Sequence, residues 1–288
     1  MRLLYAVLSL GEGPGVQLWR SRVRMLLAGA GAGLIMVGCL LPHLPTWLAE
    51  DGPEVALGDL DEDGAPERLR LRRRPMGATE LRLRSTNRGG HDHRVTTLQG
   101  AAGASFEGTA SPWRLRAADG RVLLEARHVR QVGRPTPDLL MLAGERAWRW
   151  VYLEKGFLKL DAAELIPGFS AGLLMIGDQR RVVEAIGGKI GGDGSWRVPL
   201  ATPMTLVLTF DPAGRLDRVT SRSPRLGTRD GLTVGQPAAT LATRYPGARR
   251  GDTWLSPRYG LAAQLDAQGA IRGVSVQRPW QAPDARSR

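Results

Sequence analysis

The 288-residue sequence contains a single cysteine, Cys39. No intrachain disulfide can form, so the fold must be held by packing, with a bound metal as the other possible source of stability. Apolar residues make up 42% of the chain, which is enough for a packed core. The length allows one or two domains together with additional segments.

Lysine is also scarce, because only three of the forty basic residues are lysines and the others are arginines. The formal net charge of +12 would ordinarily indicate a nucleic acid or an anionic surface as partner. An arginine skew of this kind is what a GC-rich genome produces, so part of the charge reflects codon usage. The charge alone therefore does not predict nucleic-acid binding.

Histidine is rare as well, and all four histidines precede Ser170. Residues 168–172 have the form G-x-S-x-G, but in an α/β-hydrolase the histidine base follows the serine, so the order excludes that triad. Residues 91–93 (His-Asp-His) lack two further metal ligands nearby and are interpreted as a polar loop. Residues 187–189 lack the spacing of a phosphate-binding loop. The sequence therefore predicts a protein without enzymatic activity.

Residues 25–41 form a stretch of seventeen residues without a charged side chain, at the lower end of the length that spans a bilayer. Arginines precede this stretch and acidic residues follow it, which places the remainder of the chain outside the cell. A buried core helix is the alternative, but Pro42, Pro45 and the reversal of charge favour a membrane segment. Residues 1–24 are then a cytoplasmic or spurious N-terminus.

The segment from Met36 to Cys39 resembles the bacterial lipobox. Two outcomes follow, an uncleaved signal anchor or a cleaved lipoprotein that carries its lipid on Cys39. Both predict a single-pass or lipid-anchored protein of the cell membrane, with most of the chain extracytoplasmic and the membrane as a partner.

Residues 59–67 read DLDEDGAPE, with carboxylates at positions 1, 3, 5 and 9 and glycine at position 6. Alternate carboxylates in a tight loop can converge on one point, and such oxygen ligands suit Ca²⁺. Glycine allows the backbone to bend sharply. An EF-hand needs a bidentate Glu at position 12, where this chain has Arg70, so this is not an EF-hand. An acidic surface turn held by side-chain hydrogen bonds is the alternative interpretation.

The strand–loop–strand pattern D-x-D-x-D-G-x-x-E within residues 58–71 resembles the FG-GAP/VCBS repeat of integrin-type β-propellers and secreted bacterial proteins. The resemblance implies a calcium ion, and the expected ligands are Asp59, Asp61, Asp63, Glu67 and the carbonyl of Ala65. Residues 136–142 align with residues 65–71 as a degenerate copy without the carboxylates. Two copies cannot close a propeller, so we expect a small β-sheet domain over residues 50–160.

Arginine and leucine alternate over residues 68–72, and again after Glu80 as far as Arg84. This period of two predicts a strand hairpin with the leucines on one face. The arginines on the other face are Arg68, Arg70, Arg72, Arg82 and Arg84. Because facing like charges are unfavourable, we expect acidic residues there or an anionic partner such as lipid headgroups or an envelope polymer. An ordinary solvated face is the alternative, and the lack of aromatic residues argues against nucleic acid.

The C-terminal third contains an internal duplication. The matching blocks are residues 177–187 with 235–245, 196–199 with 254–257, and 210–216 with 265–271. Three blocks in the same order predict two copies of one unit, at residues 166–222 and 230–279. Each copy is expected to form a short helix and a small antiparallel sheet with an Asp-x-x-Gly hairpin turn. Residues 280–288 are expected to be a flexible tail.

The order of glycine, helix, glycine, tryptophan, strand and hairpin in each copy resembles the BamE-like (SmpA/OmlA) domain and the related β-lactamase-inhibitor-type fold. The resemblance implies a helix-on-sheet binding or scaffolding module rather than an enzyme. Trp196 and Trp254 either cap the core of each copy or stand exposed as contacts for a protein partner.

These patterns predict an α+β, β-rich fold: a transmembrane or lipoprotein-type segment, a small β-sheet domain and two helix-plus-sheet repeats. The expected function is a membrane-tethered, extracytoplasmic binding or scaffold protein of a bacterial envelope, stabilised by calcium. The alternative is an accessory or sensory subunit of an envelope enzyme, or a hydrolase whose site the sequence does not reveal.

Overall fold

The computed structural model describes residues 50–74, 78–85, 92–131, 133–153 and 156–279. One compact unit comprises residues 51–73 and 77–288 and contains nearly all of them. Three expected features lie outside the described residues: the N-terminus 1–24, the membrane segment 25–41 with Cys39, and the tail 280–288. Within the described ranges, no helix combines the length and apolar character needed to cross a bilayer.

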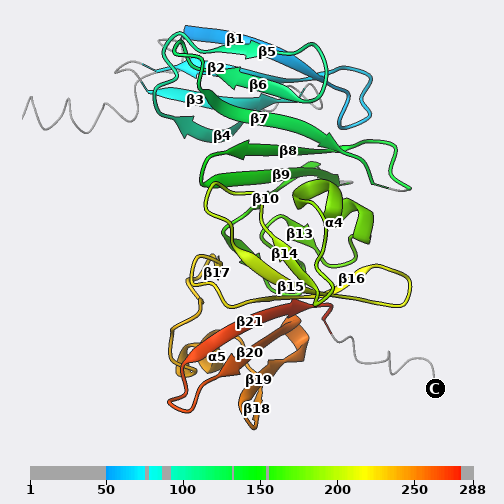
Figure 1. Cartoon of the computed structure of the whole chain (residues 1–288), viewed down its shortest axis with the longest axis vertical. Coiled ribbons are helices and arrows are strands. Elements are labelled where there is room, and N and C mark those ends of the chain that lie inside the picture. The colour runs from blue at the N-terminus through cyan, green and yellow to red at the C-terminus, as the bar shows by residue number, and fades with distance from the viewer. Residues whose placement is uncertain (1–49, 75–77, 86–91, 132, 154–155, 280–288) are drawn as a thin grey trace, which may run out of the picture. The chain divides into compact units, whose positions relative to one another are not determined.

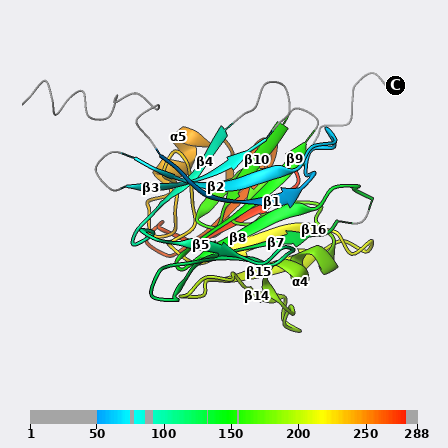
Figure 2. The same cartoon turned by 90° about the horizontal axis from the view of Figure 1, so that it is seen from above.

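The described chain is rich in β structure, as the sequence predicts, and its strands form four sheets (Figure 1). Nearly all of the strand pairs are antiparallel, and β11 with β17 is a parallel pair. The two α-helices of the described ranges are short: α4 (Arg180–Gly187) and α5 (Ala239–Arg244). In both views α4 lies beside β14 and β15 (Figures 1 and 2).

The first sheet is a meander in the order β1-β2-β3-β4. Its strands are β1 (Glu50–Gly58), β2 (Glu67–Arg73), β3 (Thr79–Arg84) and β4 (Asp92–Leu98). Strands β2 and β3 pair as the expected hairpin, with Leu69 opposite Leu83 and Leu71 opposite Leu81. These four leucines are at most 2% exposed, so the alternation places one face of the hairpin in the core.

The second sheet has six strands in the order β10-β9-β8-β7-β6-β5. They are β5 (Ser105–Glu107), β6 (Trp113–Arg116), β7 (Val122–Val129), β8 (Asp138–Ala143), β9 (Arg146–Leu153) and β10 (Gly156–Asp161). Trp113, Trp148 and Trp150 of this sheet share one buried cluster with the leucines of the first sheet. The region expected as a small β-sheet domain thus consists of two sheets around a common core.

The remaining strands form a small four-stranded sheet and a seven-stranded sheet. The small sheet, ordered β13-β12-β11-β17, contains β11 (Glu164–Ile166), β12 (Ser170–Ala171), β13 (Leu174–Met175) and β17 (Gly227–Thr228). The large sheet is ordered β14-β15-β16-β21-β20-β19-β18. Its strands are β14 (Ser195–Arg197), β15 (Thr205–Phe210), β16 (Leu216–Ser221), β18 (Ala248–Arg250), β19 (Thr253–Ser256), β20 (Leu261–Leu265) and β21 (Ile271–Gln277).

Matching backbone contacts occur in the two halves of the large sheet. The N–H of Gly177 donates to the carbonyl of Leu216, and the N–H of Gly235 donates to the carbonyl of Ile271, both at 2.7 Å. The hairpins β15–β16 and β20–β21 both turn at Asp-x-x-Gly and both have a register shift just before the turn. Strands β16 and β21 pair with each other, so the two hairpins meet at the centre of the sheet.

A buried ion-pair cluster joins β8 and β9 to the segment before α4. Arg149 is fully buried, and its guanidinium lies 2.6 Å from Asp138 and 2.5 Å from Asp178. The Nη1 atom of Arg149 also donates to the carbonyl of Leu173. Burial alone would lower the pKa of Arg149, but Asp178 and Asp138 together raise it, so the cation is retained in the core.

Candidate functional site

The acidic loop, residues 59–67, connects β1 to β2 and brings three of the four expected carboxylates together. Oxygen atoms of Asp59, Asp61 and Glu67 all lie within 4.8 Å of one another. The loop bends at Glu62 and Gly64, which have positive φ angles of 62° and 85°. Glycine adopts this backbone region without strain, whereas a side chain such as that of Glu62 does not.

Asp63 lies in the same loop but is not a member of this carboxylate group. The N–H of Ala65 donates to Asp63 Oδ1 at 2.9 Å, and the N–H of Gly64 donates to Asp59 Oδ2 at 2.9 Å. These are the short-range bonds expected of an acidic turn. The loop therefore has features of both interpretations: converging carboxylates, as a metal loop has, and the local hydrogen bonds of an acidic turn.

Glu67 is the most unusual member of the group because its side chain is fully buried. Its Oε2 atom accepts a hydrogen bond from the N–H of Leu60 at 2.5 Å, and its Oε1 atom is buried with no N–H or hydroxyl donor among the described residues. Burial raises the pKa of Glu67 to about 7, and the negative charge of Asp61 and a side-chain hydrogen bond with Asp61 add to this, against the opposing effect of the Leu60 N–H. A buried carboxylate oxygen without a partner is costly.

The second carboxylate, Asp61, is 4% exposed and is held from two sides. The hydroxyl of Ser85 donates to Oδ2 at 2.8 Å, and the N–H of Asp63 reaches Oδ1 at 3.3 Å. Asp59 is exposed, so the group opens to solvent on that side. All of its candidate ligand atoms are carboxylate oxygens, a donor set that suits Ca²⁺ or Mg²⁺ rather than a transition metal with nitrogen or sulfur ligands.

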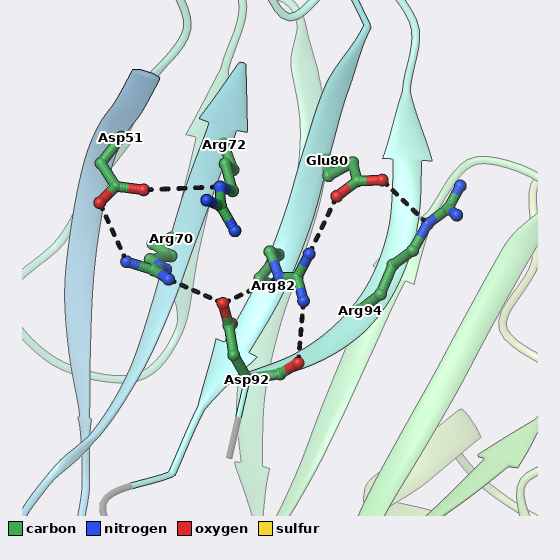
Figure 3. A network of polar contacts seen from close by, with 7 residues as sticks. All are labelled: Asp51, Arg70, Arg72, Glu80, Arg82, Asp92 and Arg94. Atoms are coloured by element: carbon green, nitrogen blue, oxygen red, sulfur yellow. Dashed lines mark hydrogen bonds and ion pairs between the residues drawn. The ribbon is translucent and has the colours of Figure 1, made fainter. Parts of the chain in front are cut away.

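The arginine face of the first sheet carries its own carboxylates, as Figure 3 shows. Arg70 lies 2.7 Å from Asp92 and 3.2 Å from Asp51, and Arg82 lies 3.0 Å from Asp92 and 3.1 Å from Glu80. Arg70 and Arg82 face each other across β2 and β3, so Asp92 on β4 separates two like charges. We call this set, with Arg72 and Arg94, the arginine network.

Asp92 is the centre of the arginine network. Its burial would raise the pKa of this carboxyl, but hydrogen bonds and charges from Arg70 and Arg82 lower it below its ordinary value. Arg82 also donates to the backbone carbonyl of Asp92 at 3.0 Å. The sequence interpretation of residues 91–93 as a polar loop was wrong for Asp92 and His93, which lie in β4. It also missed this role, because Asp92 reaches β2 across β3.

Neighbouring strands thus supply acidic residues on the arginine face, the first of the two expected alternatives. Arg68 pairs with Glu54 at 2.5 Å, and Arg72 pairs with Asp51 at 3.9 Å. Of the five arginines, Arg84 is exposed and has no ion-pair partner in the part of the chain that the structure describes. Opposed like charges on this face are therefore compensated within the sheet.

The two tryptophans of residues 166–279 contribute to the core. Trp196 is 1% exposed, and a Cβ atom added to Gly187 of α4 would lie 2.3 Å from its indole ring. Trp254 is partly buried, and its Nε1 atom donates to the carbonyl of Tyr245 at 3.2 Å. The capping role fits this geometry, whereas Trp196 is not accessible to a protein partner because α4 covers it.

Comparison of the chain with protein-family models, with curated proteins and with solved structures gives no match. Residue roles are therefore inferred from burial, hydrogen bonding and charge. By these criteria the acidic loop and the arginine network stand out in the first sheet, and a large cleft, which sequence reasoning missed, lies beside β4.

Proposed function

We propose that this chain is a membrane-tethered, extracytoplasmic binding or scaffold protein of a bacterial envelope, and not an enzyme. Calcium bound in the acidic loop stabilises its first sheet. The charge reversal across residues 25–41 supports the tether and the orientation. The observation that carries the calcium assignment is the fully buried Glu67, whose carboxylate oxygen lies within 4.8 Å of those of Asp59 and Asp61 while its Oε1 atom has no N–H or hydroxyl donor among the described residues.

A bound calcium ion would offset the cost of burying the carboxylate of Glu67. The ion would be coordinated by Asp59, Asp61 and Glu67, with Asp63 and the Ala65 carbonyl as further ligands, in keeping with the FG-GAP/VCBS resemblance. Ca²⁺ accepts six to eight oxygen ligands in flexible geometry, so water fits at the solvent side next to Asp59. Binding requires the carboxylate form, so the ion would displace the proton that Glu67 holds near pH 7.

Thermal unfolding of the full chain in detergent tests this assignment. At a calcium concentration of about 100 times Kd, ligand binding to the folded state adds about 2.7 kcal/mol. That corresponds to a rise in Tm of about 5–10 °C for a domain of this size. EDTA should reverse the rise.

The variant Glu67→Gln should lose the calcium-dependent rise in Tm. Glu62→Gln is the matched control, because Glu62 is exposed in the same loop and is not a member of the carboxylate group. The control should keep the full rise. An unchanged Tm of the wild type with EDTA and with calcium, or equal shifts in both variants, would remove the assignment.

We further propose that residues 166–222 and 230–279 are tandem copies of a BamE-like helix-on-sheet unit. The matched hydrogen bonds of Gly177 and Gly235 support this. A second matched pair of backbone bonds does so too: the N–H of Arg180 donates to the carbonyl of Gly214 at 3.0 Å, and the N–H of Ala238 donates to the carbonyl of Gly269 at 2.9 Å. The same backbone contact at aligned positions is what a duplication leaves behind. This architecture suits binding or scaffolding.

A further inference from the structure

A cleft of about 1280 Å³ opens beside β4, and we call it the basic cleft. Strands β4, β7, β9 and β10 contribute to its walls, together with the turn at Gly144 and Glu145 and the segments near Leu200 and Arg225. Its cationic residues are Arg94, Arg121, Arg146, Lys159 and Arg225, and its acidic residues are Glu145 and Asp161. The lining therefore has an excess of positive charge.

Both carboxylates of the basic cleft already have partners. Glu145 is 2.7 Å from Arg225, so this pair is neutral as a whole. Asp161 accepts hydrogen bonds from the indole of Trp148 and from the N–H of Ala163, both at 3.0 Å. Arg94 of β4 pairs with Glu80 at 3.4 Å, so, in the part of the chain that the structure describes, the cations of the cleft without an ion pair lie on β9 and β10.

Lys159 and Arg146 are the cations without a carboxylate in ion-pair contact, among the described residues that line the cleft. The Nζ atom of Lys159 donates to the carbonyl of Val95 at 2.9 Å and lies 5.3 Å from the ring centre of Trp148. Arg146 donates to the hydroxyl of Thr96 at 3.1 Å. Both side chains are thus held in place by neutral groups, with donors left for a ligand.

The cations also repel one another. Burial lowers the pKa of Lys159, and the charges of Arg146 and Arg94 lower it further, against the opposing effect of Asp161 and Glu164. A bound anion would relieve this repulsion. Arginine is suited to the task because its planar guanidinium forms paired hydrogen bonds with a carboxylate.

We propose that the basic cleft binds an acidic oligosaccharide, whose carboxylate groups pair with Arg146 and Lys159. The cleft exceeds the 300–1,000 Å³ typical of small-molecule sites, which favours an oligomer. Thr97 and Gln99 line it with groups that donate and accept hydrogen bonds, as sugar hydroxyls require. Trp148 is only 2% exposed and cannot stack on nucleic-acid bases, which disfavours a single-stranded nucleic acid.

This inference deepens the proposed binding function and rests on it, but it does not depend on the acidic loop. Isothermal titration of the full chain in detergent with a hyaluronan hexasaccharide tests it. The methyl ester of the same hexasaccharide is the uncharged control. We expect the acid to bind at least tenfold more tightly than the ester, with an affinity that falls as salt is raised.

Two sets of variants assign the binding to the cleft. The double variant Arg146→Gln/Lys159→Gln should weaken binding at least tenfold, and Arg121→Gln, whose side chain is 66% exposed, should weaken it about threefold without disturbing the fold. Arg250→Gln, an exposed arginine of β18 away from the cleft lining, should bind as the wild type does. Glu67→Gln should also bind normally, which separates this proposal from the calcium assignment.

Several outcomes would overturn the inference. Equal affinities for acid and ester, or no binding of the acid, would exclude an acidic oligosaccharide. Equal losses in Arg121→Gln and Arg250→Gln would place the binding outside the cleft. Tighter binding of a thymidine dodecamer or of a poly-glutamate peptide would assign the cleft to nucleic acid or to an acidic protein segment instead.

Discussion

At the scale of single residues, two buried charges dominate this molecule, and they are stabilised differently. Arg149 is surrounded by two carboxylates of its own chain, whereas buried Glu67 lies beside two groups of its own sign, Asp59 and Asp61. Because its charge is paired, buried Arg149 has a structural role. Burial beside like charges makes Glu67 sensitive to pH and to a bound cation.

The stability of the calcium-free protein should fall as pH rises from about 5 to 8. The pKa of Glu67 is raised from 4.5 to about 7 in the folded state, so between these values the folded chain binds more protons than the unfolded chain. The stabilising contribution is present below pH 4.5 and is lost as pH passes 7, with an upper limit of about 3 kcal/mol.

Urea unfolding in EDTA, as a function of pH, measures this effect as the difference between wild type and Glu67→Gln. Calcium should reverse the trend, because the ion binds the carboxylate form. A difference between the two proteins that is independent of pH would contradict the raised pKa.

Replacement of Arg149 by Met should destabilise the fold by about 3–5 kcal/mol, because it leaves Asp138 and Asp178 buried without a cation. The exposed pair of Arg114 and Glu125 gives the control, since Arg114→Met should cost less than about 1 kcal/mol. Both values follow from urea unfolding at pH 7. Similar losses in the two variants would mean that the cluster of Arg149 is not the stabilising feature.

At the scale of elements, the alternation of leucine and arginine predicted which side chains are buried, but it did not predict which charged side chains pair. Leu69 and Leu83 are buried where period two places them, because burial depends on the side of the strand alone. The contact between Arg70 and Asp92 depends on the register of two strand pairs and on side-chain reach, which no local pattern specifies. The position of Arg149 between two tryptophans in β9 is a signal in the sequence for a buried charge.

The basic cleft was beyond prediction for a similar reason. Lys159 of β10 bonds to Val95 of β4, which lies 64 residues earlier in the chain, and Arg225 reaches Glu145 over 80 residues. The acidic loop is the opposite case. Its carboxylates lie within nine residues, so loop geometry alone brings Asp59, Asp61 and Glu67 together.

The first sheet should depend on Asp92. Asp92→Asn removes the charge that separates Arg70 from Arg82 and should cost about 1–3 kcal/mol at pH 7, less at high salt. Asp119→Asn, in an exposed pair with Arg121, should cost close to nothing. Because the pKa of Asp92 is lowered, its contribution should be lost only as pH falls through that lowered value. Equal effects of the two substitutions would contradict the network's role.

At the scale of the whole molecule, the proposals join a membrane tether, a calcium-stabilised β region and a duplicated unit. The tether predicts that the chain fractionates with membranes and that a protease added outside intact cells degrades most of it. Cys39→Ser should release the chain from its lipid if it is a lipoprotein and leave it in the membrane if it is an anchor. Recovery of the wild type in the cytosolic fraction would contradict both.

The calcium assignment is tested most directly by equilibrium dialysis of the full chain against radioactive calcium at pH 7.5. We predict one saturable calcium ion per chain, bound equally by Glu62→Gln and not by Glu67→Gln. No saturable binding at millimolar calcium, or undiminished binding by Glu67→Gln, would contradict the assignment.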